Sequence, residues 1–440
     1  MKKKVLGALL VAASVASLAS CKSRPDSWKV DNSGDVFHIY AWNEEFKGFF
    51  EKYATDEKKA GLDKYHVDGV EVKWTIVPSS DGQYQNALDL ALKANATAKA
   101  EDKVDMFLAE ADYIKKYADS DLTQEITQLG VENFKNIYKY TEEAASSEDG
   151  WVKGVSFQCC PSALIYNRVV AKDLWGTDDP AEVSKKLDSW EKFDKVAEEA
   201  KAKGYYMTAC EAETYRVFSN NAKSAWVDED GNVEIPAVVE QWMEQSEKYV
   251  EKGYTVAADV WSADKVANIK ADANNTLCCF GPAWYYNFCM GDSKAGDWGV
   301  VEGPMAHFWG GTWLMAPTGS DNTDLVAKTM NAFINDEEVC TNLIKNEGQF
   351  TNNQKVNADV ANSADYAGNA FLGGQNDTKM FLELAKDIKF QNTTIYDQLC
   401  NEGIQQYYRE YLTGAVTKDK AIDNFYKYIK EKYPNLNVPQ

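Results

Sequence analysis

The chain has 440 residues, of which 45% are hydrophobic and 12% are aromatic. This length exceeds one comfortable hydrophobic core and favours two domains or lobes, and the hydrophobic content excludes a disordered protein. The 68 acidic residues outnumber the 47 basic ones, and the formal charge of -21 repels phosphate backbones, which argues against a nucleic-acid partner.

The chain opens with a segment typical of export. Lys2 to Lys4 precede an apolar run from Val5 to Ala19, and about 15 residues fall short of the roughly 20 that a membrane-spanning helix needs. Residues 18–21, Leu-Ala-Ser-Cys, resemble the lipobox of bacterial lipoproteins, in which a diacylglycerol is attached to the cysteine. The resemblance implies a signal peptide of residues 1–20, and a protein anchored through Cys21 on the outer side of the membrane. An ordinary signal peptide with a chance cysteine is the alternative.

The globular part begins by alternating strands with a helix. Residues 21–34 are polar and predict a tether ahead of it. Hydrophobic patterning predicts strands at Val36 to Ala41, Val70 to Val77 and Val104 to Ala109. Apolar residues at helical spacing predict a helix from Gln83 to Ala100, with Ser80 or Asp81 available as its cap. This order indicates a mostly parallel sheet with helices on its faces.

The same pattern returns after Gly150. Further strands are predicted at Val155 to Gln158, Ala163 to Tyr166, Thr276 to Phe280, Gly299 to Val301 and Thr312 to Met315. Helices are predicted from Ser189 to Gly204, across Leu325 to Ile334 and across Ala421 to Ile429, and Pro434 ends the last of these. The elements together predict an α/β fold.

Cysteine and histidine patterns predict no metal and no cofactor. Eight cysteines follow Cys21, including the pairs Cys159–Cys160 and Cys278–Cys279 in apolar context, and none has the spacing of a C-x-x-C zinc site. The three histidines lack the H-x-x-x-H and H-E-x-x-H patterns. Residues Asp228 to Asn232 favour a hairpin turn, with a calcium loop as the alternative, because their glycine stands in the fourth place rather than the sixth. Buried thiols in an exported protein fit a cell that lives without oxygen, although export could also pair some of them.

Five short phrases follow one another along the chain. They are Val104-Asp105-Met106-Phe107; Gly154 followed by Leu164-Ile165-Tyr166-Asn167-Arg168; Asp188-Ser189-Trp190-Glu191-Lys192-Phe193; Gly281-Pro282-Ala283-Trp284; and Glu302-Gly303-Pro304 before Gly310-Gly311. By their order and spacing, residues 35–433 resemble the extracellular solute-binding proteins of sugar ABC importers, the group that includes the maltose-binding proteins. Two features depart from that family: Asp105 follows valine rather than proline, and Cys159–Cys160 stand where the family's chain approaches its ligand.

The resemblance implies a two-lobed, periplasmic-binding-protein-like fold with the ligand in the cleft between discontinuous lobes. The N-terminal lobe would comprise residues 35–160 plus 304–350, and the C-terminal lobe residues 161–303 plus 351–440. The hinge crossings are expected near Cys160 to Ala163, Val300 to Pro304 and Gly348 to Asn353. The function implied is that of a monomeric receptor, not an enzyme, which closes around a sugar or oligosaccharide and delivers it to ABC transporter permease subunits.

Candidate ligand-binding residues lie where the implied fold brings strand ends and loops to the cleft. A sugar ring offers C–H patches to flat aromatic faces and hydroxyls to carboxylates and amides. In the first lobe the candidates are Trp42, Asn43, Glu44, Asp81, Tyr84, Glu110, Asp112 and Gln158. In the second lobe and the segment that returns from it they are Glu213, Tyr215, Arg216, Trp284, Tyr285, Trp309, Gly310 and Gly311. For Trp42 the alternative is a core position, and for Glu110 and Asp112 it is helix capping.

Two other readings of the cleft stay open. A receptor of the same architecture for a polyamine, a peptide or a glycerol-phosphate compound fits the fold, although a phosphorylated ligand would need more arginine than Arg216 offers. An exported carbohydrate hydrolase would use paired carboxylates such as Glu110 and Asp112, but no catalytic motif accompanies them.

Overall fold

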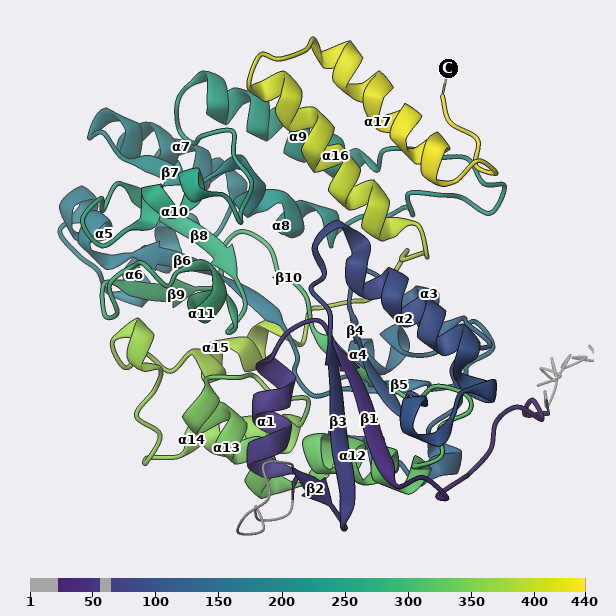
Figure 1. Ribbon diagram of the computed structural model, residues 1–440. Coiled ribbons are helices and arrows are strands. Elements are labelled where there is room, and N and C mark those ends of the chain that lie inside the picture. Colours follow the sequence, from purple (N-terminus) through teal and green to yellow (C-terminus); the bar gives the residue numbers. More distant parts are fainter. Residues whose placement is uncertain (1–22, 56–64, 440) are drawn as a thin grey trace, which may run out of the picture.

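The computed structural model describes residues 23–55 and 65–439, so the predicted signal peptide and Cys21 lie outside the described residues. Two β-sheets divide the molecule into two halves (Figure 1). The first sheet has the order β2-β3-β1-β4-β11-β5; the second has the order β10-β6-β8-β7, with β9 paired to β6. The α/β fold class is therefore confirmed, and most predicted strands lie within a residue or two of their expected bounds.

The strands of the first sheet are β1 (Val36–Ala41), β2 (His66–Val67), β3 (Val70–Ile76), β4 (Met106–Glu110), β5 (Gly154–Ser156) and β11 (Thr312–Met315). Those of the second are β6 (Pro161–Asn167), β7 (Tyr206–Thr208), β8 (Thr276–Gly281), β9 (Trp298–Val301) and β10 (His307–Phe308). Side-chain alternation along each strand gives both sheets two buried faces. In β4, Met106 and Leu108 pack in one apolar cluster, whereas Phe107 and Ala109 pack in another on the opposite face.

The helices cover these faces. Around the first sheet lie α1 (Glu45–Tyr53), α2 (Gln83–Ala94), α3 (Ile114–Ala118), α4 (Lys139–Ala144), α12 (Thr323–Asn335) and α13 (Glu337–Glu347). The second half contains α5 (Arg168–Trp175), α6 (Pro180–Leu187), α7 (Trp190–Ala202), α8 (Tyr215–Ser219), α9 (Ala237–Glu251), α10 (Ala263–Ile269) and α11 (Tyr285–Cys289). Then follow α14 (Gln354–Asn362), α15 (Asp377–Leu384), α16 (Asp397–Leu412) and α17 (Lys418–Lys432). The last two share an apolar cluster with α9, so the C-terminus belongs to the second half.

Two expectations about local structure need correction. The three strands predicted first, β1, β3 and β4, pair in parallel as expected, but the sheets as wholes are mixed. Only β1 with β3, β1 with β4 and β7 with β8 pair in parallel, and every other ladder between the named strands is antiparallel. The sheets are mixed because several strands, β11 and β10 among them, belong to segments that pass between the halves and enter a sheet from the opposite direction. Ser80 does not cap α2, since a 3-10 turn, Ser80–Gly82, precedes the helix and Gly82 stands at its N-cap with φ 69°.

The segments that join the two sheets are hydrogen-bonded to one another. Residues 157–160 lead from β5 to β6, residues 309–311 lead back from β10 to β11, and residues 348–353 follow α13. Cys159 N donates to Phe350 O at 2.8 Å, and Trp309 N donates to Cys160 O at 3.1 Å. These three segments, the crossing segments, form one connected strip between the halves. The second of them lies later in the chain than the expected Val300 to Pro304.

The described residues hold neither a metal cluster nor a bonded cysteine pair. In residues 23–55 and 65–439 no group of three or more metal-binding side chains occurs, and the eight cysteines of that range are free and buried. Asp228 accepts hydrogen bonds from Asp230 N and Asn232 N, which confirms the hairpin turn predicted there. Within the same residues, no helix combines the length and the apolar character that crossing a membrane requires.

Candidate functional site

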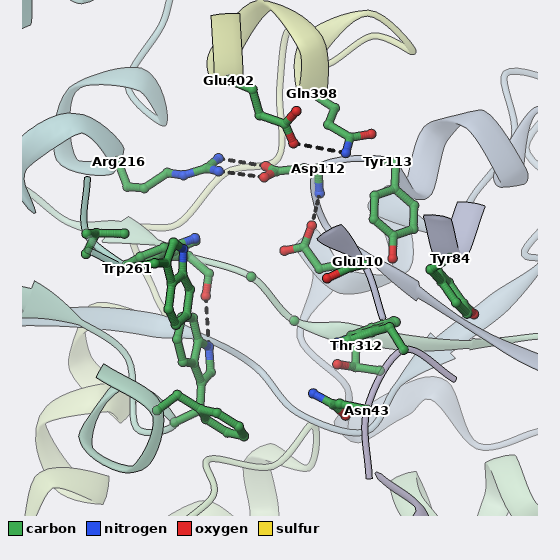
Figure 2. A pocket seen from close by; sticks show the side chains of 18 of the residues that line it. Asn43, Tyr84, Glu110, Asp112, Tyr113, Arg216, Trp261, Thr312, Gln398 and Glu402 are labelled. Carbon is green, nitrogen blue, oxygen red and sulfur yellow. Dashed lines mark hydrogen bonds and ion pairs between the residues drawn. The ribbon is translucent and has the colours of Figure 1, made fainter. Parts of the chain in front are cut away.

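A cavity with a volume of about 570 Å³ lies between the two halves, and its walls come from both (Figure 2). This volume falls within the range of about 300–1,000 Å³ that is usual for small-molecule sites. The first half contributes the segments that follow β1 and β4, together with α1 and α2. The second half contributes α8, the loop 259–261, α11 and one face of α16, and the crossing segment 309–311 forms part of the wall.

Strand pairing brings the polar groups of the first half to one edge. Because β1 and β4 run in parallel, with Tyr40 opposite Phe107, the residues that follow both strands emerge side by side. Asn43 and Glu45 follow β1, Glu110 ends β4, and Asp112 follows β4. The result is a wall of carboxylate and amide groups.

Three tryptophans from the second half and the crossing segment form an indole cluster, Trp261, Trp284 and Trp309. The rings of Trp261 and Trp284 are nearly parallel, with centroids 6.2 Å apart, and Trp309 meets Trp284 edge-on at 5.1 Å. Trp284 Nε1 donates to Trp309 O at 3.2 Å, which fixes the orientation of the central ring. Trp261 remains 58% exposed, so the cluster presents a free aromatic surface at the cavity.

Two hydrogen-bonded contacts span the cavity from one half to the other. Arg216 of α8 binds Asp112 in a bidentate ion pair, with Nη1–Oδ1 and Nη2–Oδ2 distances of 2.6 and 2.5 Å (Figure 2). Gln85 of α2 donates to Gln398 of α16 at 2.8 Å. Planar, charge-assisted pairs such as the first are strong and geometrically specific, and they hold the halves in the arrangement described here.

Two half-buried carboxyl groups on the cavity wall have raised pKa values. Burial raises the pKa of Glu45 to about 7, against a hydrogen bond from Gln349 that lowers it. Burial, and then the neighbouring Asp112 carboxylate, raise the pKa of Glu110 to about 8. Both groups therefore bind a proton more readily than an exposed glutamate does.

The structure places eleven of the sixteen sequence-predicted site residues on the cavity wall. They are Trp42, Asn43, Tyr84, Glu110, Asp112, Gln158, Arg216, Trp284, Trp309, Gly310 and Gly311. The hydroxyl of Tyr84 is used internally, since it donates to Leu108 O at 2.5 Å, so only its ring is available to the wall. Contact of these residues with a ligand stays a prediction.

The structure does not bring Glu44, Glu213, Tyr215 or Tyr285 to the wall. Glu44 is exposed and paired with Lys47, because the start of α1 turns Glu45 inward instead. Glu213 is buried, where it accepts from Tyr285 Oη at 2.6 Å and lies 3.8 Å from the ammonium of Lys265. Tyr215 is buried and donates to Asn401 at 2.5 Å. The side chain of Asp81 lies outside the described part of the chain.

Sequence reasoning missed part of the wall. Besides Glu45, the missed side chains include Trp261 and Phe288, both of which are exposed at the cavity. The missed polar face of α16 consists of Gln398, Glu402, Gln405, Gln406 and Arg409. Their spacing places them on one face of a helix and can be recognised in the sequence. However, a polar face of a helix usually faces solvent, so the spacing alone does not identify these residues as part of a binding site.

Comparisons with known proteins agree with this architecture. Residues 58–373 match the profile of a family described as bacterial extracellular solute-binding protein. No curated protein matches the chain in sequence. A crystal structure of an extracellular solute-binding protein of family 1 superimposes with a TM-score of 0.70 at 17% identity, covering 90% of this chain and 99% of that one.

Two further solved structures are similar. The ABC transporter associated binding protein from B. animalis subsp. lactis Bl-04, in complex with beta-1,6-galactobiose, has a TM-score of 0.65 at 18% identity, covering 92% of this chain and 100% of that one. The GacH receptor of Streptomyces glaucescens GLA.O, whose structures include a complex with acarbose, has a TM-score of 0.66 at 15% identity, with coverage of 92% and 100%. At these identities the likeness establishes the two-lobed fold.

Proposed function

Since this chain belongs to the bacterial extracellular solute-binding proteins, we propose that it is a carbohydrate receptor, which captures a sugar or oligosaccharide outside the cytoplasm for an ABC importer. The observation that carries the proposal is the composition of the cavity. Indole faces form one part of its wall, and carboxylate and amide groups form another. A sugar ring needs both, because its C–H patches pack on aromatic faces and its hydroxyls bind planar polar groups.

The proposed mechanism is closure of two lobes around the guest. We propose lobe limits of residues 35–160 plus 304–350 and 161–303 plus 351–440, and the pairing of β10 with β6 supports extending the second lobe to Phe308. Closure would exclude water from the cavity and present a new surface to the permease subunits. We further propose that the receptor acts as a monomer, catalyses no reaction, and is anchored to the membrane through a lipid on Cys21.

A polyamine receptor of the same fold is the second candidate, because acidic residues outnumber arginines on the wall. The neutral amide of Asn43, whose N–H groups have no partner among the described residues, favours a sugar, since a linear polyamine offers no hydroxyl acceptor to it. A hydrolase is disfavoured because Asp112 is engaged by Arg216 and is not free to act on a substrate.

Calorimetric titration of the purified protein with mono- and oligosaccharides, and with spermidine as a polyamine, tests the proposal. At least one sugar is expected to bind with a Kd near the micromolar range, about -8 kcal/mol. Binding of spermidine with no binding of any sugar would refute the carbohydrate assignment and leave the fold untouched.

A further inference from the structure

Charge on the cavity wall is unbalanced. Five carboxyl groups line the cavity, from Glu45, Glu110, Asp112, Asp259 and Glu402. Against them stand two guanidinium groups, those of Arg216 and Arg409. Arg216 is committed to Asp112, while Arg409 binds Asp259 at 3.4 Å and Glu211, behind the wall, at 2.6 Å. Within residues 23–55 and 65–439, no cation forms an ion pair with the remaining three carboxyl groups.

The three carboxyl groups without a cation differ in their surroundings. Glu402 of α16 is the most exposed of the three and accepts from Gln398 Nε2 at 3.0 Å, although partial burial raises its pKa as well. Glu45 and Glu110 are half-buried, and their partners are neutral: Gln349 Nε2 donates to Glu45 at 3.3 Å, and Asp112 N donates to Glu110 Oε2 at 2.7 Å. A carboxylate that is partly removed from water and has only neutral partners is costly, and the raised pKa values of both groups express that cost.

One of these groups shares a corner with the indole cluster. A Cβ atom on Gly310 would lie 3.4 Å from Glu110 Oε1 and 3.4 Å from ring atoms of Trp284. The space above Gly310 is therefore within van der Waals reach of both groups, and Oε1 is the oxygen that does not accept from Asp112. Gly310 has φ +72°, a conformation that favours glycine and keeps this corner free of a side chain.

We infer that this corner is a subsite for an ammonium group, and that the guest is an amino sugar rather than a wholly neutral one. Oε1 of the Glu110 carboxylate attracts such a cation by charge and can accept charge-assisted hydrogen bonds from it. Closure over a neutral sugar would leave Glu110 in its protonated, uncharged form, whereas closure over an ammonium would supply the counter-charge that allows this buried carboxyl group to ionise. The inference rests on the proposed carbohydrate function and specifies the class of sugar.

Calorimetry with matched sugars tests the inference. Each triad consists of a sugar, its 2-amino-2-deoxy form and the N-acetylated form, offered as monosaccharides and as disaccharides of glucose, galactose and mannose configuration. The best amino form is expected to bind at least about tenfold tighter than its two counterparts, which corresponds to about 1.4 kcal/mol. If a neutral or N-acetylated sugar binds tighter than every amino form, the inference is overturned and the carbohydrate function stands. If none of the amino sugars binds, the inference is overturned as well.

Proton release gives a second measure. At pH 7 an ammonium in the subsite stabilises the ionised form of Glu110, whose pKa also responds to Asp112, Arg216 and Glu402, so binding should release protons. Calorimetric titrations in two buffers of different ionisation enthalpy measure the number of protons released per bound ligand. A neutral sugar that seals the carboxyl away from water would instead cause proton uptake or none, and that result for the tightest binder contradicts the subsite.

The variant Glu110→Gln tests whether the carboxylate of Glu110 is responsible for the preference for an amino sugar. The amide keeps the shape and removes the charge, so the preference for the amino form over the N-acetylated form should fall at least about tenfold. Glu44→Gln is the matched control, because Glu44 is exposed, lies outside the cavity and should leave the preference unchanged. Thermal unfolding of both variants checks folding. A preference that survives Glu110→Gln in a folded protein refutes the subsite, while binding of spermidine alone refutes the carbohydrate function itself.

Discussion

Trp284 lies at the centre of the indole cluster and is the side chain whose loss should affect binding most. Its ring contacts Trp261, Trp309, Tyr285 and Phe288, and its Nε1 is held by a backbone carbonyl. We expect Trp284→Ala to weaken sugar binding at least tenfold, because a good stack contributes about 1 kcal/mol beyond the apolar area that it buries. Calorimetry or tryptophan fluorescence measures the dissociation constant.

The control for this variant is Trp175→Ala. Trp175 ends α5, donates to Glu199 and does not line the cavity, so its removal should leave the dissociation constant unchanged. Circular dichroism and thermal unfolding establish that both variants fold. An unchanged dissociation constant in folded Trp284→Ala would remove this residue from the site.

Glu110 makes the stability of the ligand-free protein depend on pH. Its pKa is about 8 in the folded protein against an ordinary value of 4.5, so between these values the folded state binds a proton that the unfolded state has lost. Stability therefore falls as pH rises through this window. We expect Glu110→Gln to raise Tm relative to the parent protein by a few degrees more at pH 8 than at pH 5. Parallel curves of Tm against pH for the two proteins would contradict the raised pKa.

At the scale of single residues, sequence reasoning located cavity residues that directly follow a strand. It did not identify which residues of a helix face the cavity. Trp42 and Glu110 were identified because strand ends of a parallel pair meet at one edge. Glu44 was named and Glu45 was not, whereas the structure turns Glu45 toward the cavity; which of the two faces inward depends on how α1 packs on the sheet. Glu213 was assigned to the wall from the family resemblance of its loop. The structure instead buries it beside Lys265, some fifty positions further along the chain, and sequence alone does not reveal that pairing.

At the scale of elements, α8 and α16 reach across the cavity to the first half. Arg216 of α8 binds Asp112, and Gln398 of α16 binds Gln85. Both elements are separated from their partners by at least a hundred positions of sequence, so neither contact is predictable from local patterns. The start of α7 was predictable, since a helix was expected from Ser189, and α7 begins at Trp190 with Ser189 accepting from Lys192 N.

The Arg216–Asp112 pair should stabilise the closed arrangement. We expect Asp112→Asn to speed dissociation of the bound sugar about tenfold or more, because it leaves a partly buried guanidinium without its counter-charge. Arg216→Lys should have a smaller effect, since an ammonium keeps the charge but loses the bidentate geometry. Stopped-flow fluorescence measures the rate. Equal dissociation rates in the parent protein and Asp112→Asn would show that the pair does not hold the lobes.

At the scale of the molecule, the two-sheet architecture was predictable from the order of strands and helices together with the family resemblance. The direction of the strands was not, because segments that pass between the halves add antiparallel strands to both sheets. The second crossing segment was expected near Val300 to Pro304, but it lies at residues 309–311, for the same reason. The short strand β10, two residues long, pairs with β6 before the chain leaves the second half, and two residues give too weak a periodicity to be recognised.

The eight cysteines of the described residues are all buried, and burial raises the pKa of each thiol. Alkylating reagents react with exposed thiolates, so these native groups should be slow to modify. A reactive cysteine introduced on the surface of each half would then accept a fluorescent dye without removal of the native ones. Energy transfer between such a donor and acceptor would report the separation of the halves in real time as a guest arrives and departs.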